Sequence, residues 1–150
     1  MKIRILPLLF LSAIFLASCQ GVKSDIIPQN LVCEYLVNPQ AVDVSSPRLE
    51  WVDALADADA RGVTRTAYQI EAASSRQALL QGKADLWNSS KVEDSQSLRI
   101  AYGGQPLSAG DECWWRVKVW DQNNEASEWS EPAVWVAGLP EKEWKAQWIG

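Results

Sequence analysis

Histidine is absent from the 150 residues of this sequence, and none of its three cysteines forms a Cys-x-x-Cys pair. Zinc sites in proteins depend mainly on His and Cys ligands, and the Ser-His-Asp arrangement of hydrolases needs an imidazole as its general base. These absences exclude the usual zinc sites and histidine-dependent catalysis from this chain. We therefore expect neither a metal nor a cofactor here.

A run of about 20 apolar residues, the length that a membrane-spanning helix needs, is also missing. The basic start Met1–Arg4 and the apolar residues 5–17 match the first two parts of a secretory signal. Leu16-Ala-Ser-Cys19 closes this stretch and resembles the lipobox of bacterial lipoproteins, in which the cysteine becomes the lipidated first residue. We expect a signal peptide over residues 1–18, a lipid on Cys19, and export to a bacterial membrane, facing the periplasm or the cell surface. An ordinary signal peptide with a chance cysteine is the alternative.

Basic residues are fewer than acidic ones, with 14 Lys and Arg against 19 Asp and Glu and a net charge of −5. Loss of a leader that contains Lys2 and Arg4 makes the mature chain more acidic. Nucleic-acid binding depends on basic side chains that neutralise phosphates, and anionic lipid attracts polybasic segments. We therefore exclude nucleic acid as a partner and expect the lipid on Cys19 to provide the attachment to a membrane.

Two cysteines remain after the leader, Cys33 and Cys113. An oxidising compartment would allow them to form a disulfide. Alternatively, they are buried free thiols that act as small apolar side chains. Both fall inside segments that we expect to be strands, which favours free thiols.

From residue 31 onward, short segments rich in Val, Ile, Trp and Tyr alternate with turn residues, which is typical of an all-β sandwich. We expect about seven strands, over residues 31–37, 47–52, 65–73, 85–88, 97–102, 113–121 and 133–136. One helical turn is expected over 76–81, with Ser75 as N-cap and Gly82 after its end. Residues 19–30 would be a polar tether, 31–139 the sandwich, and 140–150 a linker with the truncated start of a following β-domain.

Leu107, Gly110 and Cys113-x-x-Arg-Val117, followed by Ser127-x-Trp-Ser-Glu-Pro132, resemble the last two strands of a fibronectin type III domain. Trp51 matches a core tryptophan of the same fold. The family usually has a tyrosine at the position of Cys113, and its hydroxyl ties the strand to the preceding loop. Because a cysteine cannot make that bond, we expect the corner to be held by another group or to be weaker.

Seven motifs follow one another in order along residues 31–150: Leu31-x-Cys-Glu-Tyr-Leu-x-Asn-Pro39, Pro47-Arg-Leu-x-Trp51, Gln69-Ile…Ala72-x-Ser, Asp85-Leu-Trp-Asn-Ser, Trp115-Arg-Val-x-Val-Trp-Asp121, Trp129-Ser-Glu-Pro132 and Trp144-x-Ala-x-Trp-Ile149. Together they resemble the N-terminal sandwich of bacterial α-L-rhamnosidases, the inverting enzymes of glycoside hydrolase family 78. The resemblance implies a non-catalytic module of an enzyme that removes terminal α-L-rhamnose from glycans or glycosides. It also implies downstream domains as partners, with the catalytic carboxylates in a later (α/α)₆ barrel.

An inverting glycosidase needs two carboxyl groups, one of them kept protonated by burial. The candidates within this chain are Asp53, Asp57, Asp59, Glu141 and Glu143. They lie in polar sequence with nothing to raise a pKa, so we expect solvated charges and no catalytic residue.

Nine tryptophans, against three tyrosines and two phenylalanines, give the chain an unusual aromatic content. We expect Trp51 and Trp115 in the core. Trp114 and Trp120 should lie on the opposite face of their strand from the core, with Trp129 and Trp135 beside them. An exposed apolar patch of this size usually packs against a neighbour, so docking of the downstream domains is expected. A rhamnose-containing glycan is the alternative occupant, and the chain would then be a stand-alone surface lipoprotein that binds glycan or protein through these aromatics.

Overall fold

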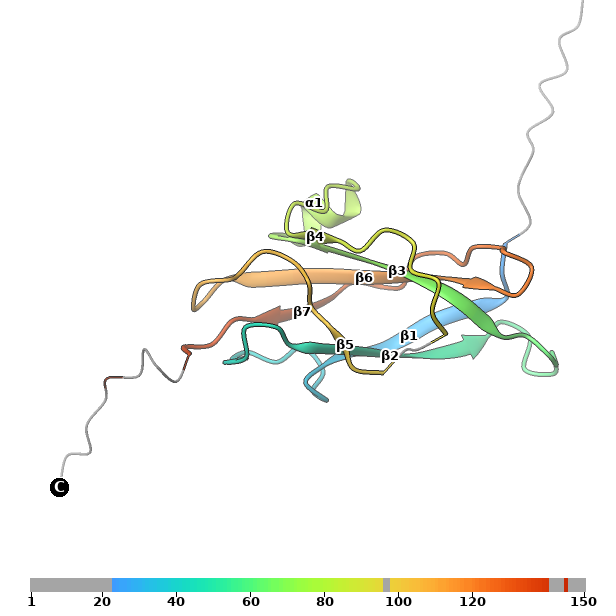
Figure 1. The fold of residues 1–150 in the computed structure, drawn as a ribbon, viewed down its shortest axis with the longest axis horizontal. Coiled ribbons are helices and arrows are strands. Elements are labelled where there is room, and N and C mark those ends of the chain that lie inside the picture. The colour runs from blue at the N-terminus through green and yellow to red at the C-terminus, as the bar shows by residue number, and fades with distance from the viewer. Residues whose placement is uncertain (1–22, 96–97, 141–144, 146–150) are drawn as a thin grey trace, which may run out of the picture.

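Two antiparallel β-sheets pack face to face in the computed structural model, which describes residues 23–95, 98–140 and 145 (Figure 1). One sheet has three strands in the order β1-β2-β5, and the other has four in the order β4-β3-β6-β7. The strands are β1 (Ile26–Cys33), β2 (Arg48–Leu55), β3 (Arg65–Ala73), β4 (Trp87–Asn88), β5 (Ile100–Ala101), β6 (Glu112–Asp121) and β7 (Ala133–Val136). The expected all-β, fibronectin type III-like sandwich of about seven strands is confirmed.

The core lies between the two sheets, and β6 shows how the sequence builds it. Successive side chains of a strand point to opposite faces, and every second residue of β6 from Cys113 to Val119 is completely buried. Trp115 of β6 and Trp51 of β2 are both in the core, as expected. The rings of Trp51 and Tyr68 meet edge to face with centroids 5.5 Å apart, which joins the two sheets.

One short helix, α1 (Arg76–Leu80), follows β3 and lies on the outer side of the four-stranded sheet (Figure 1). Ser75 is its N-cap and accepts a hydrogen bond from the amide of Ala78 at 3.2 Å. Gly82 follows the helix with a φ of 74°, a conformation that favours glycine. Both ends are therefore as expected. Within the described ranges, no helix has the length and apolarity to span a membrane.

Strand β1 begins at Ile26 and ends at Cys33, so our prediction of a first strand over residues 31–37 is wrong at both ends. The strand includes the end of the segment that we assigned to a tether. Pro28 and a bulge in the middle of the strand hide the alternation in the sequence, although β1 pairs with β2 along its length. Tyr35 continues the alternation of Leu31 and Cys33 in the sequence, but its side chain is exposed because the chain turns directly after Cys33.

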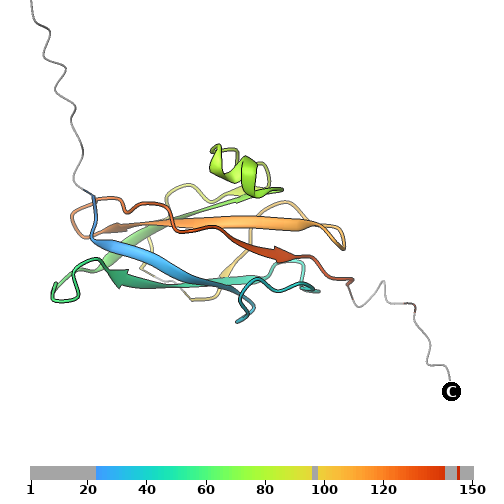
Figure 2. The same cartoon turned by 180° about the vertical axis from the view of Figure 1, so that it is seen from behind.

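The described chain enters the sandwich at one end and leaves it at the other (Figures 1 and 2). Near the exit, Val42 of the first loop forms a parallel bridge with Ala137, just after β7. Gly138 comes so close to this loop that a Cβ would lie 3.1 Å from the carbonyl carbon of Val42. The first loop therefore anchors the last strand where the chain leaves the fold.

Candidate functional site

The segment between β6 and β7 carries Trp129 onto the outer face of the four-stranded sheet. Strand β7 pairs only with the first four residues of β6 and leaves the rest of that edge without a strand partner. Two serines take the place of the missing strand. Ser130 Oγ accepts a hydrogen bond from the backbone amide of Val117, and Ser127 Oγ accepts one from that of Val119, each at 3.1 Å. These two serines hold the segment against β6, with Trp129 between them.

Cations of the same chain lie over the outer tryptophans. Arg116 Cζ and Lys118 Nζ are 4.4 and 4.5 Å from the centroid of the Trp129 ring, and Lys91 Nζ is 5.2 Å from that of Trp120. Such cation–π contacts use the faces of the rings, which are also the faces that a stacking ligand needs. The two tryptophans are half-buried and do not form an open aromatic platform.

An ion pair between β3 and β6 belongs to the same face. Arg116 Nη2 lies 2.7 Å from Glu71 Oε2, directly across the strand pair, and each side chain is only 11% exposed. Asn88 donates to the other carboxylate oxygen at 3.4 Å. Trp114, also half-buried on this face, donates its indole N–H to Glu112 at 2.8 Å. The polar groups of the outer face are thus engaged with one another, not held ready for a ligand.

Trp135 does not belong to this face, and our prediction that it joins the outer aromatics is wrong. Its side chain is 1% exposed and packs edge to face against Tyr102 and Trp115, at centroid distances of 5.1 and 6.5 Å. The reason is its register, because Trp135 stands opposite Cys113. Residues directly opposite each other in an antiparallel pair project to the same face, and Cys113 faces the core.

Cys33 and Cys113 are buried free thiols. Burial raises the pKa of Cys33 to about 12 and also raises the pKa of Cys113, so both are neutral and unreactive near pH 7. The hydroxyl of Tyr102 donates to the carbonyl of Gln105 at 3.1 Å, and its interaction with the Cys113 thiol partly opposes the effect of burial on the pKa of that thiol. Tyr102 therefore supplies a hydroxyl contact at the corner where the family usually has a tyrosine at position 113.

The candidate carboxylates serve structural contacts or lie in solvent. Asp57 Oδ1 accepts the amide of Asp59 at 2.9 Å within an exposed turn. Asp53 departs from the expected solvated charge, because burial raises the pKa of its carboxyl while Arg65 Nη1, 2.9 Å away, opposes that effect. Two further candidates lie outside the described residues: Glu141 and Glu143. In the described part of the chain, no three His, Cys, Asp or Glu side chains gather as a metal site requires.

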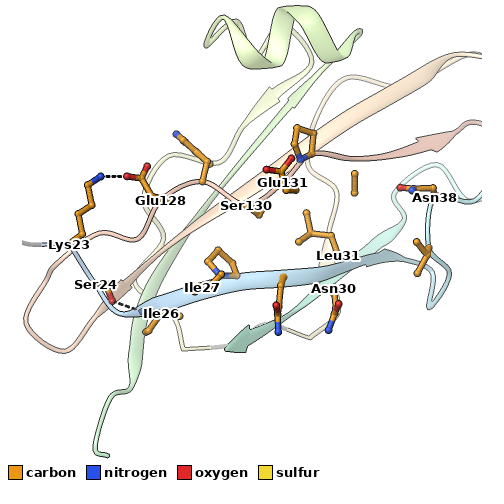
Figure 3. A pocket seen from close by; sticks show the side chains of 16 residues that line it. Lys23, Ser24, Ile26, Ile27, Asn30, Leu31, Asn38, Glu128, Ser130 and Glu131 are labelled. Atoms are coloured by element: carbon orange, nitrogen blue, oxygen red, sulfur yellow. Dashed lines mark hydrogen bonds and ion pairs between the residues drawn. The ribbon is translucent and has the colours of Figure 1, made fainter. Parts of the chain in front are cut away.

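A groove of about 670 Å³ runs between β1 and the segment that leads into β7 (Figure 3). Ile27, Leu31 and Val37 contribute to its apolar lining, and the ion pair of Lys23 with Glu128 lies at one end. The sequence did not predict this groove, because it forms where the edges of two different sheets meet. The one early signal is the apolar Ile27 inside a segment whose composition favours a tether.

The two antiparallel sheets define an immunoglobulin-type β-sandwich module. The family model described as "Rha78A-like, N-terminal immunoglobulin domain" matches residues 28–141. The chain belongs to this family. The expected likeness to the N-terminal sandwich of α-L-rhamnosidases is thereby confirmed.

Known α-L-rhamnosidases are similar to this chain. One from Formosa agariphila is 38% identical over 146 residues, which covers 94% of this chain and 15% of that protein. The solved structure of the Streptomyces avermitilis α-L-rhamnosidase complexed with L-rhamnose matches with a TM-score of 0.74 and 36% identity, over 83% of this chain and 12% of that one. The α-L-rhamnosidase structure from Dictyoglumus thermophilum matches with a TM-score of 0.75 and 31% identity, over 83% and 14%. The chain thus spans 12–15% of the length of these three relatives.

Proposed function

We propose that this chain is the non-catalytic N-terminal module of an α-L-rhamnosidase that releases terminal α-L-rhamnose from glycans or glycosides. The observation that carries the proposal is a match over 94% of the chain to 15% of a protein named α-L-rhamnosidase. The described carboxylates add support. Those that we considered for catalysis are paired with a cation or lie in an exposed turn, whereas inverting hydrolysis needs a matched acid and base.

The test compares the native polypeptide with the 150-residue chain on a chromogenic α-L-rhamnoside. We expect the native polypeptide to hydrolyse it and the 150-residue chain to be inactive. A native polypeptide that contains residues 23–140 and acts on no α-L-rhamnoside would contradict the proposal. Activity in the 150-residue chain alone would contradict its non-catalytic role.

Export and lipid attachment through Cys19 form a second part of the proposal. The support comes from the basic start, the apolar residues 5–17 and the lipobox-like Leu16–Cys19, all of which lie outside the described residues. The test is fractionation of cells that express the native protein or its Cys19→Ser variant. We expect the native protein in the membrane fraction with a lipid on Cys19, and the variant without the lipid. Equal membrane partition without any lipid on Cys19 would contradict this part.

The role of the module in this proposal is spacing and packing against the downstream domains, with Trp114, Trp120 and Trp129 as candidate contacts. A stand-alone lipoprotein that binds glycan through these aromatics has less support, because cations of the chain already lie over Trp120 and Trp129. Titration of the 150-residue chain with a rhamnose-containing oligosaccharide separates the two. Saturable binding that is lost in Trp129→Ala would favour the alternative.

A further inference from the structure

Four of the nine large apolar side chains that are exposed in the described part of the chain lie on β1 or in the turn that follows it. Ile27 is 47% exposed, and the three consecutive residues Tyr35, Leu36 and Val37 are 54%, 60% and 72% exposed. Ile27 and Val37 both line the groove described above, so groove and turn form one continuous surface. We call residues 27–37 the β1 surface. Monomeric proteins rarely leave such a contiguous apolar surface without a partner.

The turn of the β1 surface adopts an unfavourable backbone conformation. Cys33 and Leu36 exchange two backbone hydrogen bonds of 2.9 and 3.0 Å, which defines a two-residue hairpin turn. Its central residues, Glu34 and Tyr35, have φ values of 48° and 65°. Such turns strongly prefer Asn and Gly, because a side chain with a Cβ is disfavoured at positive φ. Backbone conformations of this kind persist only where surrounding contacts hold them, and they gather at functional sites.

Arg48 holds this turn in place. Its Nη2 lies 2.5 Å from Glu34 Oε2, and its backbone amide donates to Glu34 Oε1 at 2.7 Å. The Arg48 guanidinium also lies over the ring of Tyr35, with Cζ 5.1 Å from the centroid. These contacts hold the turn in one conformation, and a surface that is ordered in advance lowers the entropic cost of association.

The edge of β1 is closed to strand addition. Pro28 has no backbone N–H to donate, and a bulge interrupts the strand between Gln29 and Val32. Leu31 and Asn30 of β1 both line the groove (Figure 3). Among the described residues, Lys23 is the one cation that lines the groove, and it is paired with Glu128. These features favour a folded apolar surface as the partner, over an added strand or an anion.

We propose that the β1 surface docks the domain that follows residue 140 in the same polypeptide. This inference rests on the proposed function. The family of this chain is an N-terminal domain, and its relatives are about seven times longer, so most of their mass follows this module. The turn after β1 lies in the half of the sandwich from which the chain leaves (Figures 1 and 2). Leu36 and Val37 at this turn are 60% and 72% exposed, so their side chains are open to a neighbour.

Hydrogen exchange on the native polypeptide tests the proposal, with the 150-residue chain as reference. We expect backbone amides of residues 27–37 to exchange at least about tenfold more slowly in the native polypeptide. Leu36→Ser should abolish this difference. Leu80→Ser is the matched control, because Leu80 is a leucine of similar exposure, 53%, on α1. The control should leave the protection unchanged.

Equal exchange of residues 27–37 in the two wild-type proteins, or equal effects of the two substitutions, would overturn the docking proposal. Protection that grows with the concentration of the 150-residue chain would assign the surface to a second copy and would also overturn the docking proposal.

A native polypeptide that ends at residue 150 would overturn the docking proposal and the proposed function together. If the native polypeptide is an α-L-rhamnosidase with an unprotected β1 surface, docking alone fails. If the β1 surface is protected but the native polypeptide has no rhamnosidase activity, the proposed function alone fails.

Discussion

Cys113 on β6 stands directly opposite Trp135 on β7, and both side chains enter the core on the same side of the sheet. This register places the Trp135 ring against Trp115. We predict that Trp135→Ala lowers the free energy of unfolding by about 3–5 kcal/mol, the usual loss for a buried tryptophan. Trp114→Ala, on the half-buried outer face, should cost about 1 kcal/mol. If urea unfolding shows equal losses of unfolding free energy for the two variants, the side chains of β6 or β7 do not face the sides described here.

The ion pair of Arg116 with Glu71 gives a second prediction. Removal of one partner from a largely buried pair leaves the other charge without compensation and costs about 3–5 kcal/mol. We therefore expect Glu71→Leu and Arg116→Met each to be strongly destabilising. The double variant should be less destabilised than the sum of the two. A double-mutant cycle from urea unfolding measures the coupling, and simple additivity would contradict a direct interaction.

The contact between Arg48 and Glu34 makes stability depend on pH. Hydrogen bonds from Arg48 lower the pKa of Glu34 below its ordinary value of 4.5. A lowered folded-state pKa stabilises the protein fully above the unfolded pKa, and this contribution is lost as the pH falls through the folded value. We therefore expect Arg48→Ala to reduce the loss of stability between about pH 5 and pH 3. Identical pH profiles of the midpoint of thermal unfolding would contradict the role of this pair.

The thiols provide a prediction that needs no substitution. Because burial raises the pKa of Cys33 to about 12, a thiol reagent at pH 8 should modify neither Cys33 nor Cys113 in the folded protein. Both should react at once in guanidinium chloride. The raised pKa also makes stability depend on pH. The folded protein keeps this contribution below the pKa of the unfolded thiol, near 9, and loses it as the pH rises above that value. Rapid modification of the folded protein would contradict the burial of the thiols.

The sequence predicted β6 well because apolar and charged residues alternate from Trp115 to Val119, which indicates the side that faces the core, and burial alternates along the whole strand. The four residues of β7 are all apolar, so their sequence does not show that their burial alternates. The direction of Trp135 depends on its pairing with Cys113, which lies 22 positions earlier in the sequence. The start of β1 was missed for a related reason, since Pro28 and the bulge break the alternation within the strand itself.

The surface features could be predicted only in part. The alternation of β6 placed Trp114 and Trp120 outside the core, but the cations over Trp120 and Trp129 come from packing between segments. The groove likewise depends on the meeting of two sheet edges. The turn at Glu34 and Tyr35 was hidden because it contains neither Asn nor Gly and because Tyr35 is a strand former. The contacts of Arg48 with both residues show what holds the chain in this bend.

The size of the native polypeptide tests the central claim most directly. An antibody raised against residues 31–140 should detect it in membranes of the host, and its mass should then be determined. We predict a protein several times larger than 16.7 kDa, in keeping with relatives of which this chain spans about 15%. A native product no larger than the 150-residue chain would contradict the claim that this sandwich is the N-terminal module of a larger enzyme.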